Sequence, residues 1–212
     1  MTDPIVQLRD IGVRFGTVPV LVAVDLTIAP GEVVGVAGPN GSGKTTLLGV
    51  VATLIRPNSG TGRVLGAALG TDDVRRVRRR IGLSGHEPAV YPDLTLAENL
   101  RFVARIAGVT VEAADRALAD VGLAAAADRP AGRSSHGMQR RIDLARMLML
   151  EPDLVLLDEA HAGLDQDAEV IIDVILERTR RRRGAALIVS HDAERLARQV
   201  DRVLRIEAGA TV

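Results

Sequence analysis

The sequence predicts an α/β fold with a parallel sheet at its centre, and three observations support this prediction. Short apolar runs that are typical of buried parallel strands occur at residues 32–37, 154–157 and 185–190. A glycine-rich stretch at 38–45 follows the first run and leads into a helical pattern. Helical periodicity then fills residues 94–150, before the other two runs. Strands and helices that alternate in this way form open sheets covered by helices.

Length and composition agree with one globular domain. With 212 residues, the chain is long enough to bury a core as a single domain. Its 27 Lys and Arg residues balance 27 Asp and Glu residues, so the net charge gives no reason to expect nucleic acid or a membrane surface as a partner. The lack of cysteine excludes disulfides and thiolate metal sites and favours a reducing compartment. We expect neither a signal peptide nor a membrane-spanning segment, because the chain has no apolar run of the required kind.

The glycine-rich stretch matches the phosphate-loop pattern G-x-x-x-x-G-K-S/T at every position. Its glycines allow the backbone to bend around a phosphate chain and to aim several N–H groups at it. We expect Lys44 to reach the β- and γ-phosphates of a nucleoside triphosphate, and the hydroxyl of Thr45 to coordinate Mg²⁺. The alternative is a glycine-rich turn that merely contains Lys-Thr. It does not account for the strand before the loop and the helix after it.

Phe15 lies upstream of this loop, in a turn expected between strands at 5–10 and 20–28. An isolated exposed phenylalanine in a turn is often a packing residue. Its location also suits it to stack on an adenine ring, and both interpretations stay open. With this residue included, the predicted ATP-binding residues are Phe15, Gly38, Pro39, Asn40, Gly41, Ser42, Gly43, Lys44, Thr45 and Thr46.

Two carboxylates, Asp158 and Glu159, follow the apolar run at 154–157 directly. Ligands of open α/β sheets bind at the carboxyl ends of the strands, so both side chains are expected in that crevice. Consecutive strand residues point in opposite directions. If Asp158 faces Mg²⁺, Glu159 therefore needs another role, and general base for the attacking water is the role that we predict. The alternative is that both residues only cap the following helix.

His191 ends the strand expected at 185–190, so it is predicted to lie in the same crevice and to contact the γ-phosphate or the attacking water. Asp192 is interpreted as the cap of a helix at 193–198. The basic stretch at 71–80 is interpreted as a solvated helix face, in preference to a nucleic-acid patch.

Three helices are predicted between residues 94 and 150. The first begins with the capping box formed by Thr95 and Glu98. Thr110 can cap the second helix. The third begins near Ser135 and is ended by Pro152.

The order of these motifs resembles that of the ATP-binding subunit of an ATP-binding cassette (ABC) transporter, over nearly the whole chain. The segments that carry the resemblance are the phosphate loop, a polar loop at His86 and Glu87, residues 134–139, 154–159, 163–165 and 190–192. The resemblance implies a single domain over 1–212. It implies an ABC-type P-loop NTPase core with a small antiparallel β subdomain (1–84 and 150–212) and an inserted helical subdomain (85–149).

The resemblance also implies how such a protein works. Two copies would meet head to tail around ATP and Mg²⁺, with Asp165 at the seam, and hydrolysis at Glu159 and His191 would release them. A separate membrane-spanning subunit would contact the helical lobe near His86, and the chain would lie peripherally on the cytoplasmic side of the membrane, without a nucleic-acid partner. The segment expected to cover the γ-phosphate of the other copy is Ser135, His136, Gly137, Met138 and Gln139.

Some positions depart from the family pattern. His86 stands where most members carry glutamine, His136 replaces the first of two glycines, and Ala160-His161 stands where a proline commonly follows the glutamate. Within the family, the short C-terminus, His86 and residues 98–102 are most similar to the heme-exporter ATPase of cytochrome c maturation. The alternatives are a drug or antibiotic efflux ATPase and an ATP-dependent clamp protein outside transport.

Overall fold

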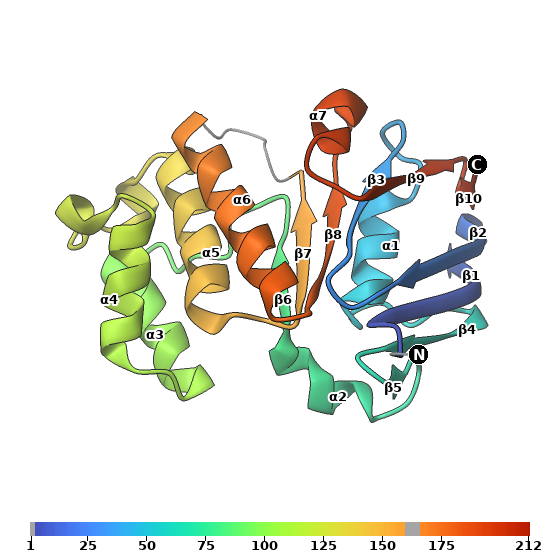
Figure 1. Ribbon diagram of the computed structural model, residues 1–212, viewed down its shortest axis with the longest axis horizontal. Coiled ribbons are helices and arrows are strands. Elements are labelled where there is room, and N and C mark those ends of the chain that lie inside the picture. Colours follow the sequence, from blue (N-terminus) through green and yellow to red (C-terminus); the bar gives the residue numbers. More distant parts are fainter. Residues whose placement is uncertain (1–2, 160–165) are drawn as a thin grey trace.

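The computed structural model describes residues 3–159 and 166–212, and it has the predicted α/β architecture with two sheets (Figure 1). The larger sheet forms the centre of the molecule. Neighbouring strands of this sheet run parallel, except at one edge, where the last strand pairs antiparallel with its neighbour. In spatial order, the strands are β10 (Ala210–Thr211), β9 (Arg202–Glu207), β3 (Val33–Ala37), β8 (Ala185–Val189), β7 (Leu154–Asp158) and β6 (Ile81–Ser84).

The smaller sheet is antiparallel and lies at the right of Figure 1. Its strands are β2 (Val18–Ile28), β1 (Val6–Phe15), β4 (Ser59–Val64) and β5 (Ala67–Ala68). β1 extends further than the sequence predicted, because its pairing with β2 continues through register shifts as far as Phe15 and Val18. Phe15 is therefore the last residue of a strand, and the turn that was expected there begins after it.

Alternation along the central strands creates two cores. In β7, Leu154 and Leu156 pack toward α1 (Lys44–Val51) and the antiparallel sheet, whereas Val155 and Leu157 pack toward the helices on the other face. All four side chains are fully buried. Because the side-chain period of a strand is two, Asp158 continues the face of Leu154 and Leu156, and this face leads to the start of α1.

The inserted helices form the left-hand part of Figure 1. They are α3 (Leu96–Ala107), α4 (Val111–Asp120) and α5 (His136–Leu150). Both bonds of the predicted capping box are present, since Glu98 N donates to Thr95 Oγ1 and Thr95 N donates to the Glu98 carboxylate. α5 packs against α6 (Gln166–Arg181), a helix that the sequence analysis had not placed.

The remaining elements are short. The basic stretch at 71–80 forms one turn of helix, α2 (Val74–Val77), followed by a 3-10 turn at Arg78–Arg80. Arg75 and Arg76 form exposed ion pairs with Asp72 and Asp73. Two further 3-10 turns lie at Ala124–Ala126 and Ala131–Arg133, and α7 (Ala193–Ala197) follows β8.

Candidate active site

The phosphate loop connects the end of β3 to the start of α1. Gly43 precedes the helix with a φ of +103°, a conformation that residues with a Cβ atom rarely adopt. A Cβ atom at this position would lie 2.8 Å from the carbonyl oxygen of Val20 and 2.7 Å from the side chain of Leu21. Only glycine fits here, and the first N–H groups of α1, which have no partner within the helix, stay available to an anion.

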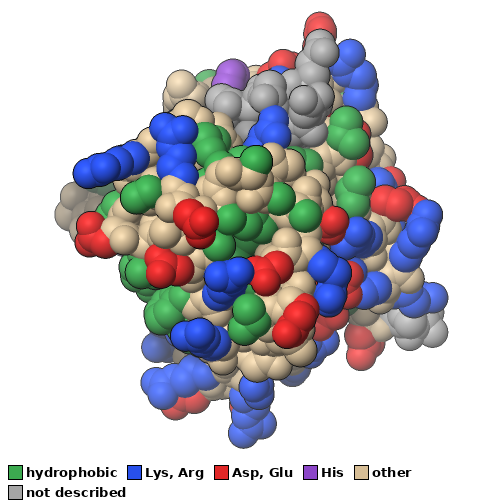
Figure 2. Space-filling model, turned by 90° about the vertical axis from the view of Figure 1, so that its left-hand side faces the viewer, with side chains coloured by type: hydrophobic (Ala, Val, Ile, Leu, Met, Phe, Trp, Pro, Cys, Tyr) green, Lys and Arg blue, Asp and Glu red, His purple; other side chains and the backbone are tan. Residues whose placement is uncertain are grey.

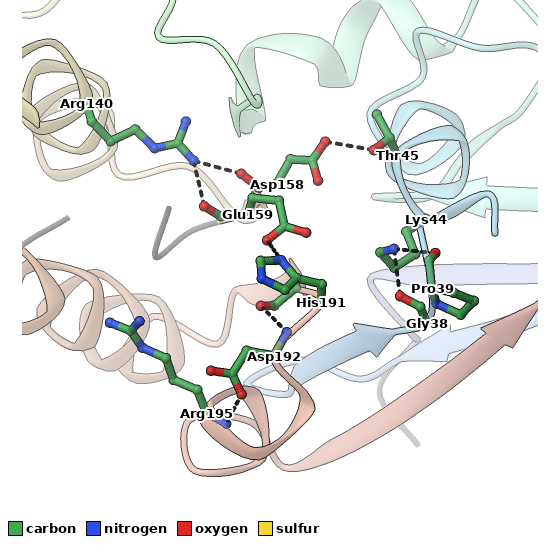
Figure 3. Close-up of polar contacts among 11 residues, drawn as sticks. Gly38, Pro39, Lys44, Thr45, Arg140, Asp158, Glu159, His191, Asp192 and Arg195 are labelled. Carbon is green, nitrogen blue, oxygen red and sulfur yellow. Dashed lines mark hydrogen bonds and ion pairs between the residues drawn. The ribbon is translucent and has the colours of Figure 1, made fainter. Parts of the chain in front are cut away.

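Lys44 and Ser42 belong to this loop and have buried polar side-chain atoms. The Lys44 ammonium is buried and donates to the carbonyl oxygens of Gly38 and Pro39, both at 2.8 Å (Figure 3). An ammonium group has three N–H bonds, so one donor is left for a phosphate oxygen. The buried hydroxyl of Ser42 has no hydrogen-bond partner among the described residues. Unpaired buried polar groups are costly, so the loop fits an anionic ligand that supplies hydrogen-bond acceptors.

Thr45 and Asp158 meet across the crevice, where Thr45 Oγ1 donates to Asp158 Oδ2 at 3.0 Å (Figure 3). Burial raises the pKa of Asp158, while the hydrogen bond from Thr45 opposes this shift. Within the described residues, no cluster of three His, Cys, Asp or Glu side chains could hold a metal ion. A hydroxyl beside a carboxylate nevertheless fits Mg²⁺, which prefers oxygen ligands and takes only one or two from the protein when substrate phosphates supply others.

Glu159 and His191 come from the ends of neighbouring parallel strands. His191 Nδ1 lies 2.8 Å from Glu159 Oε2 (Figure 3). Glu159 is largely buried, whereas the His191 side chain is two-thirds exposed. Asp192 caps α7 as predicted, because its carboxylate accepts a hydrogen bond from Arg195 N at 3.0 Å. The arrangement therefore offers a carboxylate that can accept a proton and an imidazole that orients it.

These groups line one pocket of about 550 Å³. It brings together parts of the chain that are distant in sequence, namely the phosphate loop, the polar loop at His86 and the strand ends at Glu159 and His191. Phe15 is not one of its lining residues. It is about half exposed at the end of β1, and Val20 of β2 lines the pocket instead.

The segment from Ser135 to Gln139 is separate from this pocket. Ser135 caps α5, and its hydroxyl accepts a hydrogen bond from Met138 N at 3.3 Å. Met138 packs against the helical core, and the Gln139 amide donates to the carbonyl of Ala131. Ser135 and His136 are exposed and remain available to a ligand held by another molecule. Asp165, Ala160 and His161 lie outside the described residues.

Two buried charged residues of α5, Arg140 and Asp143, were not predicted from the sequence as part of the site. Arg140 donates to the carbonyl oxygens of Asp158 and Glu159, and Asp143 accepts from the hydroxyl of Ser84. Burial lowers the pKa of Arg140 and raises that of Asp143. A usable signal was present, because charged residues at positions 140, 143 and 146 recur every three residues and so share one face of the helix.

A family model described as ABC transporter matches residues 21–162. Among curated proteins, the cytochrome c biogenesis ATP-binding export protein CcmA 2 of Cupriavidus metallidurans is 36% identical over 90% of this chain and 91% of the relative. The zinc import ATP-binding protein ZnuC of Pseudomonas putida is 37% identical over 96% of this chain and 75% of the relative.

Solved structures show the same architecture. The ATP-binding cassette MJ0796, solved as a dimer in a post-hydrolysis state bound to ADP and Pi, has a TM-score of 0.86 against this chain. It is 26% identical, and the match covers 97% of this chain and 96% of the solved one. The likeness therefore extends over both sheets and the inserted helices.

Proposed function

This chain belongs to the ABC transporter family as an ATP-binding subunit with ATPase activity, and from that premise we propose that it drives transport through a separate membrane subunit. The observation that carries the proposal is the pocket in which Lys44, the Thr45–Asp158 contact and the Glu159–His191 contact converge. A phosphate cradle, a metal site and a proton acceptor are the groups that hydrolysis of a triphosphate requires.

In the proposed mechanism, the loop from Gly38 to Thr46 binds the phosphates of ATP. Backbone N–H groups at the start of α1 and the third donor of Lys44 bind the phosphate oxygens. Thr45 and Asp158 would hold Mg²⁺, which when bound supplies positive charge to the β- and γ-phosphates. Phe15 is proposed to stack on adenine, and its exposed ring at the end of β1 is free to do so.

Glu159 acts as the general base in this mechanism. Its carboxylate accepts a proton from the water that attacks the γ-phosphorus, and this raises the nucleophilicity of the oxygen as the new bond forms. His191, with Nδ1 toward Glu159, fixes the direction of the carboxylate and turns Nε2 toward the phosphate. His86 lines the same pocket. We propose that His86 and Glu87 lie beside the γ-phosphate of bound ATP.

A second copy is proposed to complete the site. Ser135 and the N-terminus of α5 form an exposed anion site that is not part of this chain's own pocket, so a phosphate held by another molecule is its natural ligand. We propose the head-to-tail arrangement in which residues 135–139 cover the partner's γ-phosphate and Asp165 lies at the seam. The solved structure of MJ0796, a dimer with ADP and Pi, supports the pairing of two copies.

The membrane subunit is proposed to dock beside the polar loop, on the helical subdomain that we assign to residues 85–149. Tyr91, Phe102 and Ile106 are exposed there, and the two rings pack edge to face with centroids 5.1 Å apart. Figure 2 shows the side of the molecule that carries α3 and α4, where hydrophobic side chains lie among charges of both signs. No helix in the described part of the chain has the length and apolar character to cross a membrane. We propose a peripheral location on the cytoplasmic side, where the membrane subunit would hold the chain.

Heme export for cytochrome c biogenesis is the cargo assignment that we favour. The relatives have different functions, with cytochrome c biogenesis export for CcmA 2 and zinc import for ZnuC. His86 and residues 98–102, which resemble the heme-exporter ATPase, are the observations that support the first. Drug or antibiotic efflux, and an ATP-dependent clamp outside transport, are the alternatives.

The central test is Glu159→Gln, which keeps the size of the side chain but removes its basicity. Wild type with Mg²⁺ and its membrane subunit should hydrolyse ATP. The variant should lose at least about 100-fold in kcat and still bind ATP, and it should accumulate as an ATP-bound dimer in size-exclusion chromatography. A wild type without turnover would leave only the clamp function. Identification of the subunit that co-purifies from solubilised membranes tests the cargo assignment.

A further inference from the structure

One face of α5 carries three charged residues that are removed from solvent. Arg140 is 1% exposed and Asp143 is fully buried, while the side chain of Arg146 is 17% exposed. Charged side chains are rarely buried unless their hydrogen-bonding capacity is used. All three form hydrogen bonds in one region of the molecule, which consists of the polar loop between β6 and α3 and the strand ends beside it.

Arg140 joins this helix to the two segments that carry the proposed catalytic groups. Its guanidinium donates to the carbonyl oxygen of Gly85, where the polar loop begins. It also donates to the carbonyl oxygen of Asp158 at 2.7 Å and to that of Glu159 at 3.3 Å (Figure 3). A guanidinium is a rigid fork of five donors, so one side chain can hold these three carbonyl groups in a fixed relation.

The backbone of Glu159 needs such support. Its φ is +50°, in the left-handed region that residues with a Cβ atom adopt only at an energetic cost, and such conformations persist where surrounding contacts fix them. Glu159 N donates to the carbonyl of Val189 at 2.9 Å, and Arg140 binds its carbonyl on the other side. These two contacts hold the residue at both ends of its backbone, and this sets the position from which its carboxylate extends toward His191.

The other two residues of the face hold the far end of the polar loop. Asp143 accepts a hydrogen bond from Ala89 N at 3.3 Å, and Arg146 donates to Ala89 O at 3.1 Å. With Arg140 on Gly85, both ends of the segment that contains His86 are bound to α5. The polar loop and the Glu159 backbone therefore share one support.

We propose that Arg140 is a positioning residue for hydrolysis, which sets the geometry of Glu159 and of the polar loop through their backbone carbonyl groups. This inference rests on the proposed role of Glu159 as general base. Arg140 is not among the residues that line the nucleotide pocket, and its donors bind carbonyl groups of the chain itself. Its loss should therefore reduce kcat and leave ATP affinity nearly unchanged, because the phosphate loop is intact.

Arg140→Met and Arg140→Lys test this, with Arg78→Met as the matched control. Arg78 donates to the carbonyl of Thr53 at 2.9 Å, and Thr53 also has a left-handed φ, of +60°, but both lie outside the pocket. For each folded variant, kcat comes from steady-state hydrolysis and the Kd for Mg·ATP from titration with a fluorescent ATP analogue. Arg140→Met should lose about 10- to 100-fold in kcat with Kd within about threefold of wild type. Arg140→Lys should recover part of kcat, and Arg78→Met should match wild type.

Three results would overturn the inference: unchanged kcat in Arg140→Met, a loss of ATP affinity as large as the loss of kcat, or an equal loss of kcat in Arg78→Met. If Arg140→Met does not fold, Arg140→Lys alone tests the inference. Its kcat should fall by less than that expected for Arg140→Met, and its Kd for Mg·ATP should again stay close to that of wild type. Failure of the proposed function is recognised separately, because wild type would then be inactive or Glu159→Gln would remain active.

Discussion

His191 Nδ1 lies 2.8 Å from Glu159 Oε2, so two adjacent strands deliver an imidazole and a carboxylate to the same point (Figure 3). The contact uses one ring nitrogen and leaves the other for the pocket, which His191 lines. Glu159 is the more buried partner, with a side chain 17% exposed against 67% for His191. The contact therefore fixes the two groups relative to each other.

Replacement of His191 by alanine should lower kcat by about 10- to 100-fold, because the Glu159 carboxylate loses the partner that orients it and the γ-phosphate loses a contact. The Kd for Mg·ATP should change little, since the phosphate loop is unaltered. Steady-state ATPase assays and nucleotide titration measure the two quantities. Arg198→Ala, at the exposed end of α7, is the matched control and should behave as wild type. An alanine variant with wild-type kcat would remove His191 from the mechanism.

Gly43→Ala should abolish nucleotide binding and destabilise the fold, whereas Gly41→Ala should be milder. Both glycines have positive φ, +103° and +79°, so both variants carry backbone strain. Only the Cβ atom at Gly43 would also collide with neighbouring atoms, because none lies within 4 Å at Gly41. We expect about 1–2 kcal/mol of destabilisation from strain alone and about 1–3 kcal/mol more from the collision.

Urea unfolding of the two glycine variants gives their stabilities, and titration with a fluorescent ATP analogue gives their affinities. The comparison is internal, because the variants add the same methyl group two residues apart. Equal stabilities would mean that Val20 and Leu21 move aside at no cost, and the close approach at Gly43 would then not determine the shape of the loop.

Thr45→Val should raise the Mg²⁺ concentration needed for half-maximal hydrolysis by about tenfold. Valine is nearly isosteric with threonine but supplies no oxygen, so the metal would lose one ligand and Asp158 would lose the hydrogen bond at 3.0 Å. Titration of ATPase activity with MgCl₂ at fixed ATP measures the requirement. Binding of ATP in EDTA serves as the control and should be similar in both proteins. An unchanged Mg²⁺ requirement would exclude Thr45 as a ligand.

Sequence patterns located those parts of the site that depend on local rules. The apolar run before Asp158 and Glu159 predicted that both carboxylates lie at a strand end in the crevice, and in the structure Asp158 meets Thr45 there. Capping preferences located the start of α5 at Ser135. Arg140 was missed because a charged residue in a helix is expected to face solvent, whereas this one is buried and binds the carbonyl at the end of β7. Phe15 was placed in a turn because β1 keeps its pairing through irregular register, which no period-two pattern predicts.

Asp143→Asn should make the folding stability of the protein less sensitive to rising pH. Burial raises the pKa of Asp143 above its ordinary value of 3.8, although Arg146, Arg140 and the hydrogen bond from Ser84 oppose the shift. A group that binds its proton more tightly in the folded state contributes stability that is complete below pH 3.8. This stability is lost as the pH rises through the folded-state pKa. Asparagine does not titrate, so the variant should gain stability relative to wild type over that interval.

Urea unfolding of both proteins at a series of pH values, from below the ordinary carboxyl pKa upward, gives this difference. Each unit by which folding raises the pKa contributes about 1.4 kcal/mol to it. Ser84→Ala is the companion variant with the opposite sign, because loss of the donor 3.1 Å from the ionised carboxylate raises the pKa further and steepens the pH dependence. The prediction is wrong if the stabilities of Asp143→Asn and wild type differ by the same amount at every pH. The ion pair with Arg146 would then compensate fully for burial, and Asp143 would ionise as readily in the folded protein as in the unfolded chain.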